Sequence, residues 1–101
     1  MAASEALPAA ALSLPAGAAP VACVDVGATK VAVCVADEHG MRGRLTEPTA
    51  KEGSPDALGL QLVRMISQSC AAAGLSPAQI SAVGVSSCGP FVLRQGLIEL
   101  A

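Results

Sequence analysis

Apolar and small residues alternate in two short runs that predict neighbouring β-strands. Val21 to Gly27 predicts a short, fully buried strand, and Val31 to Asp37 predicts a second in which Val alternates with Ala and Cys. Residues 27–30 (Gly-Ala-Thr-Lys) between them are few enough for a tight hairpin. After a turn at residues 37–40, the more polar run from Arg42 to Glu47 predicts a third strand near a sheet edge. The chain is therefore expected to open with two antiparallel hairpins.

A repeat of about four residues then predicts one amphipathic helix. Ser54 is expected to be its N-cap, with Pro55 at the first helical position and Asp56 opposing the helix dipole. Gly74 is expected to end it. The apolar face is predicted to consist of Leu58, Leu62, Val63, Ile66, Cys70 and Ala73.

The rest of the chain completes an α/β pattern. The S-x-x-Q string Ser76–Gln79 predicts a single helical turn. Ala82 to Ser86 predicts a further strand, residues 87–90 a loop, and Gly96 to Leu100 the start of another strand. The predicted order is β-β-β-α-β. Its strand–helix–strand step predicts that the first and fourth strands pair in parallel through a right-handed crossover, unlike the β-α-β-α order of a Rossmann unit.

Residues 1–20 differ in composition from the rest of the chain. They are rich in Ala and Pro, lack a basic start, and are interrupted by Pro8, Pro15 and Pro20, which is not the pattern of a secretory signal. We expect a flexible tail over residues 1–20 and one small folded unit over residues 21–101. No uninterrupted stretch approaches the roughly 18 apolar residues of a membrane span, so no membrane partner is expected.

The net charge, the aromatic content and the cysteine spacing argue against two classes of function, nucleic-acid binding and zinc binding. The formal net charge is −2 and aromatic residues make up 1% of the chain, which argues against a nucleic-acid partner. The cysteines form no C-x-x-C pair, and His39 is the single histidine, so a zinc-binding site is not expected. The cysteines instead indicate reduced thiols in a cytoplasmic protein. His39 itself is expected to be a solvated turn residue.

A hairpin tip at Ala28 and Thr29 would place Cys23 opposite Cys34, on the same sheet face as Asp25. Free thiols are expected there, because a bridge closing so short a loop constrains the unfolded chain little and strains easily. A redox switch is the alternative.

Candidate chemistry lies in Asp25 and residues 27–30, where one predicted strand ends and the next begins. Small residues let the backbone approach phosphate oxygens, while Thr29 supplies a hydroxyl and Lys30 a compact positive charge. Asp25 can hold Mg²⁺ through water. The string matches neither a P-loop nor G-x-G-x-x-G. A plain hairpin with solvated Asp25 and Lys30 accounts for it equally well.

These residues resemble a known family. Residues 21–33 are similar to the opening of the ROK family (repressors, open reading frames and sugar kinases), within the actin-like, hexokinase-like ATPase superfamily. The resemblance continues through Asp37, Gly40, residues 47–49 (Glu-Pro-Thr), the predicted helix and residues 83–90, and so covers residues 21–101. It implies the β-β-β-α-β first part of an actin-like, ribonuclease H-like ATPase domain, truncated within the N-terminal lobe.

The resemblance also implies which residues bind ligands. It places the ATP phosphates near Gly27, Ala28, Thr29 and Lys30, and the Mg²⁺ near Asp25. The family usually has Gly-Gly before the Thr, and the second of these is Ala28 here.

The second loop of the resemblance implies the sugar contact, at Gly89. That loop usually reads Pro-Gly-Pro, whereas Cys88 precedes Gly89 in this chain.

The resemblance implies an ATP-dependent sugar kinase of glucokinase type, acting on a hexose, with ATP and Mg²⁺ as cofactors and a homo-oligomeric intact protein. The Asn-Asp pair that carries the family's catalytic base is missing, since the chain contains no Asn, so the chain alone is expected to be inactive. A structural zinc is expected only in a missing C-terminal part. The alternatives are a ROK-type sugar-responsive transcriptional regulator and a non-catalytic truncated product.

Overall fold

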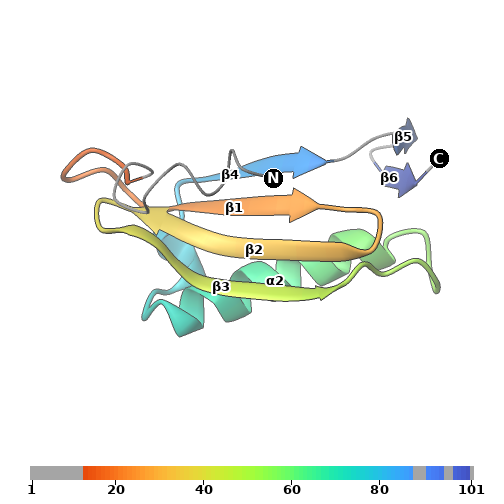
Figure 1. Ribbon diagram of the computed structural model, residues 1–101, viewed down its shortest axis with the longest axis horizontal. Helices are drawn as coiled ribbons and strands as arrows, with labels where there is room; N and C mark the ends of the chain where they lie inside the picture. The colour runs from red at the N-terminus through yellow and green to blue at the C-terminus, as the bar shows by residue number, and fades with distance from the viewer. Residues whose placement is uncertain (1–12, 88–90, 95–96, 101) are drawn as a thin grey trace, which may run out of the picture.

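The computed structural model describes residues 13–87, 91–94 and 97–100 (Figure 1). It has an α/β fold with a four-stranded sheet in the order β3-β2-β1-β4, so the predicted class and the edge position of the third strand are confirmed. The sheet consists of β1 (Val21–Val26), β2 (Lys30–Asp37), β3 (Gly40–Pro48) and β4 (Ala82–Ser87). Between β3 and β4 lie α2 (Ala57–Ala72) and the 3-10 turn η2 (Pro77–Gln79), and the chain continues into β5 (Phe91–Arg94) and β6 (Leu97–Leu100).

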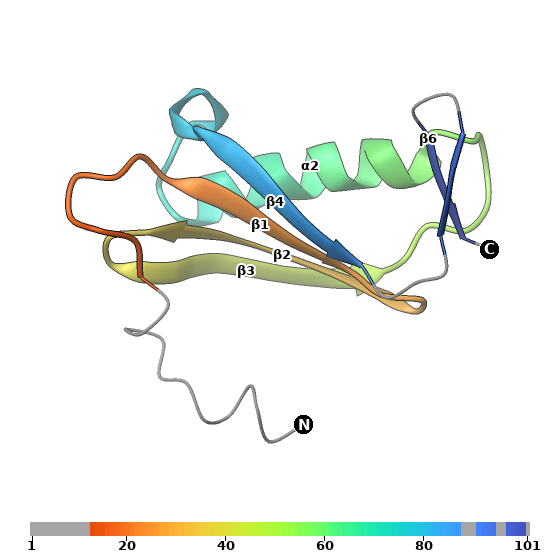
Figure 2. The same ribbon diagram turned by 90° about the horizontal axis from the view of Figure 1, so that it is seen from above.

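The strand directions follow the predicted topology. β1 and β2 pair antiparallel, as do β2 and β3, while β1 and β4 pair in parallel (Figure 2). The antiparallel pair of β5 and β6 forms a sheet of its own, and β5 was not expected from the sequence. Because β1 and β4 run the same way, their carboxyl ends meet at one edge of the sheet.

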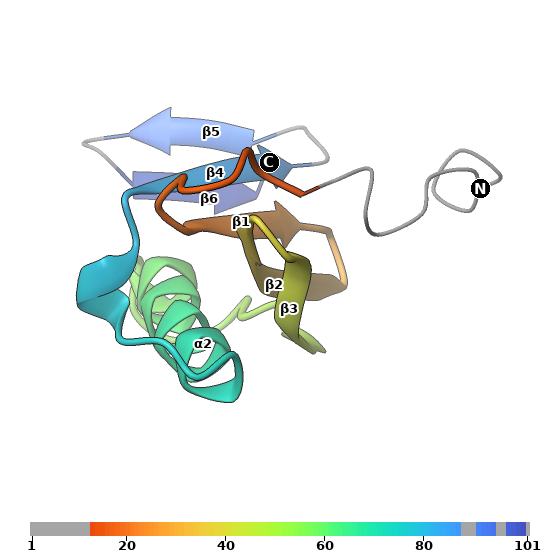
Figure 3. The same cartoon turned by 90° about the vertical axis from the view of Figure 1, so that its left-hand side faces the viewer.

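The hydrophobic core lies between one face of the sheet and α2 (Figure 3). It is formed by Val24, Val26, Val31, Val33, Leu58 and Met65. The prediction that the first strand is fully buried is wrong, since its burial alternates and Asp25 points to the opposite, uncovered face. The helix packs on β2 and β3, so Val83 and Val85 of β4 stay 49% and 52% exposed.

The helix departs from its predicted start and face. It begins at Ala57 after Asp56, not at Ser54, because the Ser54 carbonyl accepts from the amide of Ala57 in a tighter turn. The first α-helical bond runs from the amide of Leu60 to the carbonyl of Asp56. Val63, predicted to be on the buried face, is 67% exposed. The residues buried on α2 are Leu58, Gln61, Met65, Ser69 and Cys70, two of which are polar and bond to the sheet side of the fold.

Local signals at the end of the helix are confirmed. Gly74 adopts φ +75°, and the amide of Leu75 donates to the carbonyl of Cys70 at 2.8 Å, the pattern of a glycine-terminated helix. The capping box at Ser76 and Gln79 is present in η2. His39 is exposed in the β2–β3 turn, as expected.

The described part of the N-terminal segment bonds to the folded unit. The amide of Leu14 donates to the carbonyl of Asp37 at 2.9 Å. The amide of Ser81 donates to the carbonyl of Pro20, also at 2.9 Å. The flexible tail over residues 1–20 remains a prediction.

Candidate functional site

The tip of the β1–β2 hairpin is a closed turn that requires glycine at its first position. The amide of Gly27 donates to the carbonyl of Lys30 at 2.8 Å. A Cβ atom added at Gly27 would lie 2.8 Å from that same oxygen, closer than a carbon can approach without a shift. Ala28 and Thr29 are therefore presented at the tip, and both are exposed.

Thr49 holds this tip from the other side. Its hydroxyl donates to the carbonyl of Gly27 at 2.8 Å, and its amide donates to the carbonyl of Thr29 at 3.0 Å. Thr49 is buried, so both bonds are shielded from water. Residues 47–49 and the hairpin both belong to the family resemblance. These two bonds show that they are in direct contact.

Gln61 fixes the segment that carries Thr49. Its side-chain amide donates to the carbonyl of Pro48 at 2.8 Å, and its side-chain oxygen accepts from the amide of Ala50 at 2.9 Å. Sequence reasoning missed this residue. The available signal was a Gln three residues after Leu58 and four before Met65, a spacing that places all of them on one helix face.

An ion pair between Arg64 of α2 and Glu47 of β3 also connects the helix to this segment. The guanidinium of Arg64 donates to Glu47 at 2.6 Å and 2.7 Å. These bonds, with a further one from Gln61, lower the pKa of Glu47 from 4.5 to about 2. The pair raises the pKa of Arg64 in turn. The helix is therefore bonded to the end of β3 by the neutral side chain of Gln61 and by the ion pair of Arg64 with Glu47.

Asp25 lies on the uncovered face of the sheet, two residues before Gly27. Parallel pairing places it opposite Ser86, whose hydroxyl donates to one Asp25 carboxylate oxygen at 3.1 Å. The carboxylate is exposed. One orienting hydrogen bond on an otherwise open carboxylate fits Mg²⁺, which binds few protein oxygens and keeps several waters.

The candidate phosphate site is thus assembled at one edge of the sheet. β1 and β4 end there, and the hairpin tip and Thr49 lie at the same edge. Lys30 starts β2 opposite Gly27, and its side chain is exposed. Gly89, expected at the sugar side, lies outside the described residues.

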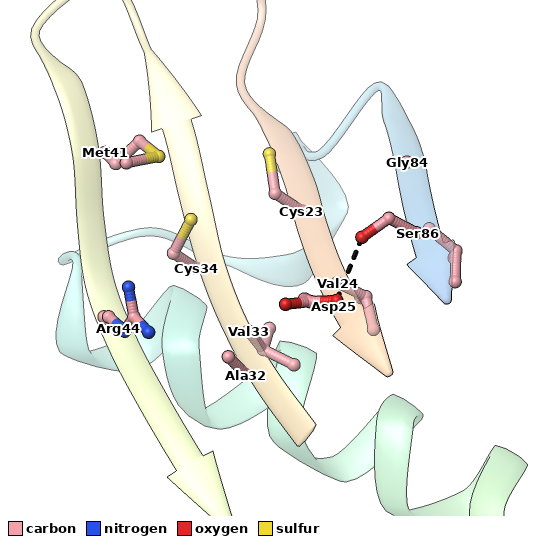
Figure 4. Close-up of a pocket in the computed structure, with 11 residues that line it drawn as sticks. Cys23, Val24, Asp25, Ala32, Val33, Cys34, Met41, Arg44, Gly84 and Ser86 are labelled. Carbon is pink, nitrogen blue, oxygen red and sulfur yellow. Dashed lines mark hydrogen bonds between the residues drawn. The ribbon is translucent and has the colours of Figure 1, made fainter. Parts of the chain in front are cut away.

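A pocket of about 630 Å³ occupies the uncovered sheet face (Figure 4). Its lining includes Asp25 and Ser86 at the end of the pocket nearer the hairpin tip, and Cys23, Cys34 and Met41 farther away. The predicted register of Cys23 opposite Cys34 is confirmed, and both thiols are free. Burial, followed by the neighbouring Cys23 thiol, raises the pKa of Cys34.

Two further features are absent from the described part of the chain. Among the described residues, no group of three or more His, Cys, Asp and Glu side chains is placed to hold a metal ion. No helix in residues 13–87 is long and apolar enough to cross a bilayer.

Comparison with known proteins gives this chain no family. A scan against models of protein families finds no match, and a search of curated proteins finds no relative.

Proposed function

We propose that this chain is the N-terminal phosphate-binding segment of an ATP-dependent sugar kinase, similar to the glucokinases of the ROK family, that phosphorylates a hexose. The observation that carries the proposal is the double hydrogen bond from Thr49 to the hairpin tip. It joins the two strings that resemble the family, and it holds the backbone of residues 27–30 in one conformation. A rigid turn with small residues suits phosphate, because its amides need no reorganisation on binding.

Each residue has a distinct role in the proposal. Gly27, Ala28 and Thr29 supply the close backbone approach and the hydroxyl, and Lys30 neutralises phosphate charge. Asp25 would hold Mg²⁺ through water, with Ser86 orienting the carboxylate. When bound, the ion neutralises phosphate charge that grows during transfer. Phosphoryl transfer depends mainly on such positioning and charge neutralisation.

The uncovered surfaces support the view that further elements complete the kinase. Val83 and Val85 present apolar side chains on β4 that α2 does not cover. The catalytic base, any zinc site and the second lobe would belong to those elements, and this chain alone would not phosphorylate sugar. The intact kinase would be a cytoplasmic homo-oligomer.

The proposal is tested by titrating the isotope-labelled chain with ATP and Mg²⁺ and following amide shifts by NMR. We expect shifts concentrated at residues 27–30, and weaker binding in Lys30→Ala. Arg42→Gln, which removes an equal charge beside the β2–β3 turn at the other end of the sheet, serves as the control. Shifts absent from residues 27–30, or unchanged in Lys30→Ala, would contradict the proposal. A sugar-responsive regulator without catalysis would bind the hexose but give no ATP-dependent shifts there.

A further inference from the structure

Three sulfur-bearing side chains from three adjacent strands line the pocket on the uncovered sheet face. Cys23 comes from β1, Cys34 from β2 and Met41 from β3 (Figure 4). Both thiols are partly accessible, and Met41 is 43% exposed. The proposed phosphate site uses none of these sulfur atoms.

The strand register explains why the two thiols remain free. The bond from the amide of Gly27 to Lys30 makes those residues a hydrogen-bonded pair, and such pairs recur at every second position of an antiparallel ladder. Cys23 and Cys34 therefore also form a hydrogen-bonded pair. Cβ atoms in such pairs lie near the upper end of about 4.5–5.5 Å, whereas a disulfide needs about 3.5–4.5 Å. The spacing is wide for a direct bond between the sulfur atoms.

The same spacing suits an ion between the thiols. Metal–sulfur bonds of about 2.3 Å let one ion join sulfur atoms up to about 4.6 Å apart, without moving the backbone. The Cys23 thiol is near enough to affect the ionisation of Cys34. The strands thus place the two thiols opposite each other, close enough to interact.

Met41 supplies the third donor. It pairs with Ala36, which lies two residues after Cys34 on the same face of β2. The register of β2 and β3 shifts between Val33 and Val35, so regular ladder spacing does not apply at Cys34, but Cys34 and Met41 line the same pocket. Methionine has three rotatable bonds and an exposed position here, so its thioether can close on the ion.

We propose that Cys23, Cys34 and Met41 form a binding site for monovalent copper. Thiolate and thioether ligands select soft ions, and Cu(I) accepts a set of few sulfur donors. On binding, each thiol releases its proton to solvent as its sulfur bonds the ion, and the copper keeps its oxidation state. The site is separate from the proposed kinase function and does not depend on it.

The test is an anaerobic competition between the reduced chain and bicinchoninate, whose Cu(I) complex is coloured. The starting protein carries Cys88→Ser, because Cys88 is a further thiol outside the described residues. We expect one Cu(I) per chain in both the wild type and Cys88→Ser. Cys23→Ser and Cys34→Ser should each abolish competition.

Met41→Leu, which keeps the volume of the side chain, should weaken binding at least as much as the roughly tenfold loss seen when an outer-sphere partner is removed. Circular dichroism checks that each variant is folded. X-ray absorption should show sulfur alone around the copper. Binding that survives in folded Cys23→Ser or Cys34→Ser, binding lost in Cys88→Ser, or nitrogen and oxygen ligands at the copper would overturn the proposal.

Discussion

The hydroxyl of Thr49 donates to the carbonyl of Gly27 at 2.8 Å, across 22 residues of sequence. This bond connects the end of β3 to the tip of the β1–β2 hairpin, next to the end of β1. The bond is partly buried and comes from a residue that is itself buried. The geometry of residues 27–30 thus depends on a residue outside the hairpin.

Thr49→Val should therefore loosen the hairpin tip. Valine keeps the shape of the side chain but removes the donor of this partly buried bond, at a cost of about 1–3 kcal/mol in the free energy of unfolding. Urea denaturation measures the loss, and hydrogen exchange should show faster opening at residues 27–30. Thr49→Ser keeps the hydroxyl and should behave nearly as the wild type. Equal stability of the Val and Ser variants would show that the bond contributes nothing.

Gly27→Ala and Gly59→Ala should change stability in opposite directions. At Gly27 the new Cβ would meet the carbonyl oxygen of Lys30 at 2.8 Å, and such overpacking costs about 1–3 kcal/mol. At Gly59, inside α2, nothing lies within 4 Å of the new Cβ, and Ala should stabilise the helix by about 1 kcal/mol. Thermal unfolding of both variants measures the difference. A stabilised Gly27→Ala variant would contradict the tight turn.

Acid should destabilise the protein through Glu47. Its pKa is about 2 in the folded state and 4.5 for the free side chain, so the charge pair stabilises the fold above pH 4.5. That contribution is lost progressively as the pH falls from 4.5 toward 2. Glu47→Gln should flatten the dependence of unfolding free energy on pH across this window. Arg64→Gln should flatten it similarly, and the double variant should do no more than either single one.

The features that could be predicted from the sequence are those determined by residues close together in the chain. The turn at residues 27–30 set the register that places Cys23 opposite Cys34, and Gly74 ended the helix. The prediction failed for residues whose burial depends on hydrogen bonds to residues far away in the sequence. Gln61 is buried because it bonds to Pro48 and Ala50, and Ser69 because its hydroxyl donates to the carbonyl of Gly43 at 2.7 Å.

Gly43 illustrates that limit. It adopts φ +67° near the irregularity between β2 and β3, and a Cβ there would lie 2.3 Å from the carbonyl oxygen of Ser69. Close contact between α2 and β3 therefore requires glycine. A pattern of apolar positions carries no sign of this contact. The same holds for Ser86 and Asp25, which meet only after β4 has paired with β1.

Asp25 supplies the sharpest test of the phosphate site, because its charge should act in opposite senses with and without Mg²⁺. Without the ion, an exposed carboxylate near the hairpin tip repels ATP, so Asp25→Asn should strengthen binding of free ATP to this chain. With Mg²⁺, the carboxylate helps to hold the hydrated ion, so Asp25→Asn should weaken binding of the magnesium complex. Calorimetric titration with and without Mg²⁺ measures both effects. Glu38→Gln removes an equal charge at the opposite end of β2 and should change neither by a comparable amount. If Asp25→Asn shifts both affinities in the same direction, Asp25 acts only through its charge and does not hold the ion.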